Sequence, residues 1–252
     1  MLKAAPFQFA DFPLLPPGFA ASLGATVVVA PHPDDESLGC GGLLALLRQA
    51  GQPVSTVLVS DGTMSHPNSR RFPPPARQAL RAAELRDALL ILGVDSQSTL
   101  HLNLPDGGVP TTGAAGFAAA VARLREHLTA QRPQTVLVPW RRDPHPDHRA
   151  TSQLVGAACA GLPTPPRVVE YVVWAWERAA AAELPQPGEV RGWRLDITPV
   201  LDVKQQAIAA HRSQLTAVID DDPTGFQLSA AMLAHFAQPF EVYLEAAESS
   251  PR

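Results

Sequence analysis

The side chains of this chain that could do chemistry lie in two short clusters. The first, Pro31-His32-Pro33-Asp34-Asp35-Glu36, directly follows the apolar run 26–30. The second, His145-Pro146-Asp147-His148, follows the apolar run 136–139. Imidazole nitrogens and carboxylate oxygens are ligands of zinc in hydrolases. Two such clusters, each placed after an apparent strand, therefore predict a metal-dependent hydrolase.

Each cluster also has a simpler explanation. Asp34 or Asp35 could cap a helix that begins near residue 37, and Asp147 could cap a helix from residue 149 onward. Capping leaves the crowding of the first cluster unexplained, because adjacent carboxylates raise one another's pKa unless a cation is near. It also leaves both histidines of the second cluster without a role. The metal interpretation accounts for all of these residues together.

The elements that must position the clusters alternate between strand and helix. We expect strands at residues 25–30, 54–59, 99–104 and 135–139, and helices at 39–51, 76–92 and 114–131. This alternation predicts an α/β fold, a Rossmann-like three-layer sandwich with a mostly parallel sheet and helices on both faces. Ligands of such sheets bind beyond the carboxyl ends of the strands. Both clusters lie at that edge, so we expect one joint metal site there.

The remaining segments are less regular. We expect strands at 168–176, 190–197 and 240–245, the last with one exposed face, and a helix at 200–215. Residues 1–24 are expected to form an irregular lead-in, and residues from about 246 to 252 a loose tail. No internal repeat or long linker divides the chain, so we expect a single domain over residues 1–252.

The composition narrows the class of protein. Hydrophobic residues make up 46% of the 252 residues and the net charge is −4, which argues against disorder and against a nucleic-acid-binding surface. The sequence contains no run of about 18 apolar residues, so no membrane span is predicted. The first residues also lack the apolar block of a secretory signal. Two cysteines, Cys40 and Cys159, are too few for a disulfide framework. We expect a cytoplasmic protein, and its oligomeric state, including a homo-oligomer, stays open.

The two clusters resemble the signatures of the PIG-L/LmbE-like superfamily of zinc-dependent N-deacetylases. The first signature, (A/P)-H-P-D-D-E, matches residues 31–36, and the second, H-P-D-H, matches residues 145–148. Members act mainly on small molecules and glycoconjugates that contain N-acetylglucosamine. The resemblance implies an enzyme that hydrolyses the linear amide of such an N-acetylated sugar. The segment 204–214 resembles a further recurrent block of the family, without an assigned role.

The resemblance also implies roles by position. His32, Asp35 and His148 would be the ligands of one zinc ion per chain, although Fe²⁺ or Co²⁺ suits the same ligands. Asp34 would be the general base that takes a proton from the attacking water. His145, as an imidazolium, would stabilise the oxyanion together with the metal.

Three further carboxylate and guanidinium groups complete the expected site. Asp147 would hold His145 in its charged form and correct orientation. Arg81, in a match to the family's R-x-x-E-L segment, and Asp106, in Leu-Pro-Asp-Gly-Gly, would contact the substrate. The alternatives are a solvated Arg–Glu helix pair for Arg81 and a Pro-Asp-Gly turn for Asp106. Asp143, two residues before His145, stands where some members have a tyrosine, and could tune His145 or Arg142.

Two other functions remain open on the same residues. A metal-dependent phosphoesterase would use similar ligands, but two-metal sites usually recruit more carboxylates than these loops supply. A non-catalytic sugar-binding module on the same fold would have no obvious use for Asp34. The N-deacetylase interpretation therefore leads.

Overall fold

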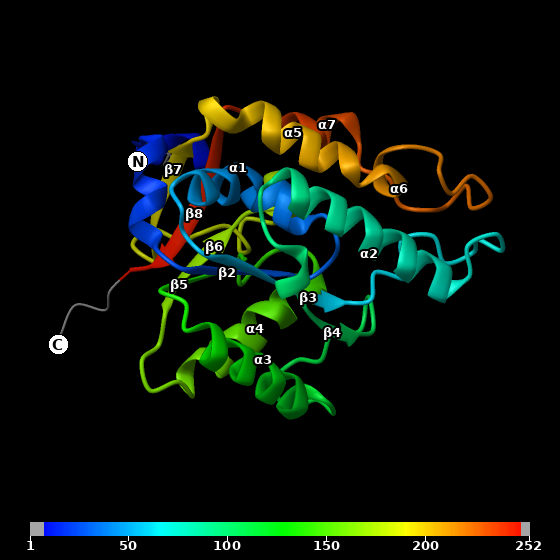
Figure 1. Cartoon of the computed structure of the whole chain (residues 1–252), viewed down its shortest axis with the longest axis horizontal. Helices are drawn as coiled ribbons and strands as arrows, with labels where there is room; N and C mark the ends of the chain where they lie inside the picture. The colour runs from blue at the N-terminus through cyan, green and yellow to red at the C-terminus, as the bar shows by residue number, and fades with distance from the viewer. Residues whose placement is uncertain (1–7, 248–252) are drawn as a thin grey trace, which may run out of the picture.

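The computed structural model describes residues 8–247, whose strands form one sheet between two layers of helices (Figure 1). The strands are β1 (Leu14–Leu15), β2 (Thr26–Ala30), β3 (Val54–Ser60), β4 (Leu100–Leu104), β5 (Thr135–Pro139), β6 (Arg167–Tyr171), β7 (Val190–Asp196) and β8 (Phe240–Ala246). The α-helices are α1 (Asp35–Gln49), α2 (Pro74–Ile91), α3 (Phe117–Gln131), α4 (Pro146–Ala160), α5 (Leu201–Ala210), α6 (Arg212–Leu215) and α7 (Ala230–Phe236). The predicted three-layer α/β fold is confirmed.

The order of the strands places both chemistry-bearing loops side by side. The sheet runs β1-β7-β8-β6-β5-β2-β3-β4, and every neighbouring pair is parallel except the two pairs that β8 makes with β6 and β7. After β4 the chain returns to the other side of β2 to form β5. The loops that leave β2 and β5 therefore diverge at a switch point of the sheet, where open α/β sheets bind their ligands.

The central strands and the helices around them form the two larger of the three apolar core clusters in the described residues. β2, β3 and β5 are buried along their whole length, as expected for parallel strands covered on both faces. Helices α1, α2 and α5 cover one face of the sheet, and α3 and α4 cover the other (Figure 1). No described helix is long and apolar enough to cross a membrane.

Helix α1 lies unusually close to its neighbours because of its glycines. A Cβ atom at Gly39 would stand 2.3 Å from Cδ2 of Tyr171, and one at Gly42 would stand 2.6 Å from Cγ2 of Ile197. The helix begins at Asp35, four residues before the expected start, and its first turn carries Asp35 and Glu36. Acidic side chains are favourable in a first turn, where the helix dipole is positive.

Three expectations for the C-terminal part need correction. The strand expected over 168–176 ends at Tyr171, and Trp174–Trp176 forms a 3₁₀ helix. The helix expected over 200–215 breaks at His211 into α5 and α6. Strand β8 has no exposed face over its interior, because Tyr243 and Leu244 pack into apolar clusters and its glutamates are buried in ion pairs.

The lead-in is more regular than expected. It contains 3₁₀ helices at Phe9–Asp11 and Pro17–Leu23, and between them β1 pairs with the edge of β7. Of the expected loose tail, Ala246 closes β8, and residues 248–252 lie outside the described residues, as do residues 1–7.

Candidate metal centre

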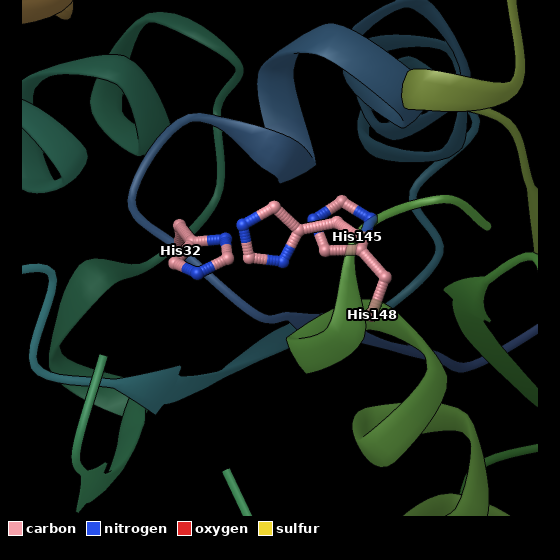
Figure 2. A group of neighbouring side chains, drawn as sticks. All are labelled: His32, His145 and His148. Carbon is pink, nitrogen blue, oxygen red and sulfur yellow. The ribbon is translucent and has the colours of Figure 1, made fainter. Parts of the chain in front are cut away.

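The two predicted clusters meet above the switch point of the sheet. His32 lies in the loop after β2, whereas His145 and His148 lie at the start of α4, and the three rings gather in Figure 2. The ring centroids are 4.7 Å apart for His32 and His145 and 5.0 Å apart for His145 and His148. One nitrogen of each ring lies within 4.8 Å of the others. Residues more than a hundred positions apart thus form one site.

The three predicted ligands approach one another at distances that suit a metal ion. Asp35 Oδ2 lies 3.2 Å from His32 Nδ1 and 3.2 Å from His148 Nε2. Ligands at 2.0–2.1 Å around a tetrahedral zinc are about 3.3 Å apart. Within the described residues neither buried nitrogen of His148 makes a hydrogen bond, although each lies within 3.3 Å of a carboxylate oxygen. This geometry fits coordination of a divalent cation by His32, Asp35 and His148.

The second nitrogens of both histidine ligands face carboxylates. His32 Nε2 lies 3.1 Å from Asp147 Oδ2 and 3.2 Å from Asp106 Oδ1, and His148 Nδ1 lies 3.3 Å from Asp143 Oδ1. Metal-bound histidines commonly present their other N–H to a carboxylate, which fixes the ring and its tautomer. The contact of His32 with Asp106 and Asp147 is therefore compatible with the predicted metal site, although these three residues also form a candidate metal-binding group of their own.

The expected pairing between Asp147 and the ring of His145 is wrong. The Asp147 carboxylate accepts the backbone N–H groups of Gly107 and Val109 in addition to facing His32. His145, not Asp147, caps α4: its Nδ1 accepts the backbone N–H of Asp147 at 3.2 Å. The Asp147 side chain therefore contacts the predicted ligand His32 and not the ring of His145.

The electrostatics of His145 also differ from expectation. Burial, with the positive charges of His148 and His32, lowers the pKa of His145 to about 4, which favours a neutral ring over the predicted imidazolium. Because Nδ1 accepts a backbone N–H, the proton of the neutral ring belongs on Nε2. A neutral His145 that lines the cavity can still donate one hydrogen bond, from Nε2, to an oxygen of a substrate.

Asp34 is a buried carboxylate that does not serve as a helix cap. It precedes α1, but its side chain makes no capping hydrogen bond, and its φ of 146° is unusual for a residue with a Cβ atom. Burial raises the pKa of Asp34 to about 6, against the opposing effect of Arg81. Backbone strain of this kind concentrates at functional sites. These properties suit a group that exchanges a proton near neutral pH.

Arg81 contacts the loop that carries Asp34. Its guanidinium donates to the carbonyl oxygens of Pro33 and Gly62 at 2.9 and 3.0 Å, and to Asp34 Oδ2 at 3.3 Å. The side chain is 3% exposed, which rules out a solvated helix pair. Glu84, the expected partner in that pair, instead accepts from Ser213.

Replacing Arg81 by Lys is expected to lower kcat more than it raises KM. A lysine keeps the charge but cannot reach all three acceptors of the planar guanidinium, so Asp34 loses part of its support. We expect a loss of about 10- to 100-fold in kcat, the size of effect that a misplaced catalytic group causes. Steady-state kinetics separate the two constants. A raised KM with an unchanged kcat would instead assign Arg81 to substrate binding alone.

A cavity of about 230 Å³ opens over the metal ligands. Its polar floor contains His32, Asp34, Asp35, Arg81, Asp106 and His145. Its wall contains residues that the sequence interpretation missed, namely Leu38, Met64, Trp174, Arg178, Gln214, Phe226 and Leu228. The ring centroids of Trp174 and His145 are 6.4 Å apart in a stacked arrangement. Cζ of the Arg178 guanidinium lies 4.0 Å from the centroid of the Trp174 ring. Trp140, the aromatic residue beside the second cluster, is fully buried away from the cavity.

The fold and the site together define an α/β protein with a His/Asp metal-binding group at the switch point of its sheet. The chain belongs to the PIG-L family, because the family model described as GlcNAc-PI de-N-acetylase matches residues 27–159, more than half of the chain. The predicted family resemblance is therefore confirmed.

Named relatives agree with this assignment. A 1D-myo-inositol 2-acetamido-2-deoxy-alpha-D-glucopyranoside deacetylase of Actinosynnema mirum is 30% identical over 250 residues, covering 84% of this chain and 87% of the relative. A probable N-acetyl-alpha-D-glucosaminyl L-malate deacetylase 2 of Bacillus cereus is 29% identical over 198 residues, covering 77% and 86%. A mutant deacetylase of teicoplanin biosynthesis matches the fold with a TM-score of 0.65 at 20% identity, covering 90% and 100%.

Proposed function

We propose that this protein is a metal-dependent N-deacetylase that hydrolyses the acetamide of a small molecule containing N-acetylglucosamine. The observation that carries the proposal is the buried Asp34 carboxylate, which caps no helix and lines the same cavity as the ligand group. Membership of the PIG-L family and the names of the relatives support the substrate class. A cytoplasmic location belongs to the same proposal, supported by the two free, buried cysteines.

Zinc is the proposed ion, held by His32, Asp35 and His148 with about one ion per chain. Two imidazoles and one carboxylate suit zinc, Fe²⁺ or Co²⁺ better than the all-oxygen sites of Mg²⁺ or Ca²⁺. When bound, such an ion supplies Lewis acidity that acidifies a water molecule and polarises a carbonyl group. Asp147, Asp106 and Asp143 would hold the two histidines in the orientation that coordination needs.

Asp34 and His145 would carry out the proton transfer and the charge stabilisation. Asp34 accepts a proton from the water that attacks the acetyl carbon, and then delivers it to the leaving amine. Its pKa of about 6 leaves it ionised, and yet a usable acid, near neutral pH. His145 donates its Nε2–H to the oxygen that becomes negatively charged. A neutral imidazole is sufficient for this role, because His145 only donates a hydrogen bond and does not transfer its proton.

Replacing His145 by Ala is expected to reduce turnover by about 10²–10³-fold, the usual cost of losing an oxyanion donor. The metal content should match the parent, because His145 is not a ligand in this account. Steady-state kinetics and metal analysis of the dialysed variant check both statements. Gln in place of His145 keeps an N–H donor and should recover part of the rate. An unchanged rate in the Ala variant would remove His145 from the mechanism.

Arg81 and Asp106 remain proposed substrate contacts. Both line the cavity, although the guanidinium of Arg81 also supports the Asp34 loop and Asp106 accepts the backbone N–H of Met64. A sugar hydroxyl could still reach a free lone pair of the Asp106 carboxylate. The apolar wall around Trp174 suits the less polar face of a sugar ring.

A screen of N-acetylated sugars and glycosides tests the proposed function. The expected result is free amine from one or more compounds that contain N-acetylglucosamine, with none after treatment with a chelator. Phosphoesters in the same screen test the phosphoesterase alternative, which would release phosphate and no amine. Tight sugar binding without amine release would support the non-catalytic sugar-binding module.

A further inference from the structure

The segment 204–214 supplies polar groups that meet buried carboxylates on three other elements. The contacts are Lys204 Nζ to Glu241 Oε1 at 2.7 Å, His211 Nε2 to Glu36 Oε1 at 3.0 Å, and Ser213 Oγ to Glu84 Oε2 at 2.6 Å. All six residues are nearly or fully buried. The segment therefore connects α5 and α6 with α1, α2 and β8. Of its three contacts, the one between His211 and Glu36 lies next to the residues of the candidate metal centre.

That contact runs through Glu36, which has no exposed surface. Its Oε1 faces His211 and accepts the hydroxyl hydrogen of Ser37 at 2.6 Å. Its Oε2 accepts the backbone N–H of Asp34 at 3.1 Å. His211 is 1% exposed and lies at the break between α5 and α6. A continuous set of polar contacts therefore joins His211 to the main chain of the base.

The main chain of Asp34 needs such support. Its φ of 146° lies in a region that residues with a Cβ atom rarely adopt. Because Asp34 precedes the first turn of α1, no carbonyl group of that helix can accept its N–H. The Glu36 carboxylate takes the place of such an acceptor, and Arg81 of α2 donates a hydrogen bond to the Asp34 side chain.

We propose that Glu36 and His211 are positioning residues that hold Asp34 in the conformation needed for proton transfer. This inference rests on the proposed role of Asp34 as the base. Glu36 fixes the Asp34 peptide, and His211 fixes Glu36 through the 3.0 Å contact of its Nε2 with Oε1, since a buried carboxylate without a partner is unfavourable. His211 lies outside the residues 27–159 that the family model matches, so the C-terminal part of the chain contributes to the site.

The test compares crystal structures and kinetics of His211→Phe, Glu36→Ala and Glu36→Gln with those of the parent. In the first two variants we expect the φ angle of Asp34 to change from its value of 146° in the parent. We expect kcat to fall by about 10²-fold, with KM and metal content close to the parent. Glu36→Gln keeps an oxygen that can accept the Asp34 N–H, so it should retain more activity than Glu36→Ala. Being nearly isosteric, it also shows whether the loss in Glu36→Ala comes from the missing acceptor, and His211→Phe tests the proposal without changing Glu36.

Lys204→Met is the matched control, because it breaks another buried ion pair of the same segment that does not reach Asp34. This variant should unfold at a lower temperature but keep the kcat of the parent. An unmoved Asp34 with an unchanged kcat in His211→Phe and Glu36→Ala would overturn the proposal, as would an equal loss of kcat in Lys204→Met. The variants could displace Asp34 while the parent releases no amine from any N-acetylated sugar. That pair of results would support the positioning role and refute the proposed function.

Discussion

Asn in place of Asp34 is expected to slow turnover by about 10²–10⁴-fold, the usual contribution of a general base. The amide has nearly the shape of the carboxylate but cannot accept the proton of the attacking water. The metal should stay bound, because Asp34 is not among the ligands that approach His32 and His148. Steady-state kinetics and metal analysis on one preparation measure both effects.

Asp35→Asn is the matched control for this prediction, since the two carboxylates are neighbours in sequence and both are buried. Asp35 Oδ2 faces both histidine ligands, so its variant should lose metal before it shows any separate effect on the chemical step. Equal metal loss in the two variants would mean that the roles of base and ligand are not divided in this way.

His148→Ala is expected to lose most of its bound metal and, with it, nearly all activity. The substitution removes a ligand from a fully buried position and leaves Asp35 and Asp143 without the ring that lies between them. Removal of one of three protein ligands leaves too few for a stable catalytic site. Metal analysis after dialysis measures the loss, and circular dichroism checks the fold.

His101→Ala controls for the loss of a histidine elsewhere in the sheet, because His101 lies on β4 and lines no part of the cavity. It should retain the metal content of the parent. A His148 variant that holds metal as well as the parent would show that the ion binds elsewhere, for example at the group of His32, Asp106 and Asp147.

The central sheet and the convergence of the two clusters could be predicted from local sequence. β2, β3 and β5 are short apolar runs rich in β-branched residues, the pattern typical of parallel strands that are buried on both faces. The two clusters follow β2 and β5 directly. Because carboxyl ends of parallel strands share one edge of the sheet, the strand assignment predicted one joint site, and the pairing of β2 with β5 brings His32 and His148 together there.

Contacts between residues distant in sequence set the features that were not predicted. The alternation in 240–245 suggested an exposed face, but Glu241 and Glu245 are buried because Lys204 and Arg167 meet them. Strand β8 also lies between β6 and β7, a position that its own residues do not reveal.

The same reason explains the errors within the site. The family resemblance implied that Asp147 holds His145, whereas its carboxylate faces His32 from another loop. The charge on His145 depends on burial and on two other histidines, which sequence spacing does not encode. Trp174 and Phe226 reach the cavity wall only through the fold of the C-terminal part.

The most direct test of a metal-dependent amidase is a titration of metal-free protein with zinc, followed by acetate release from the best N-acetylated sugar of the screen. We expect acetate and free amine in equal amounts, with activity rising until about one ion is bound per chain, as one set of three protein ligands requires. No acetate at any zinc level, or activity only after a second ion binds, would contradict the account.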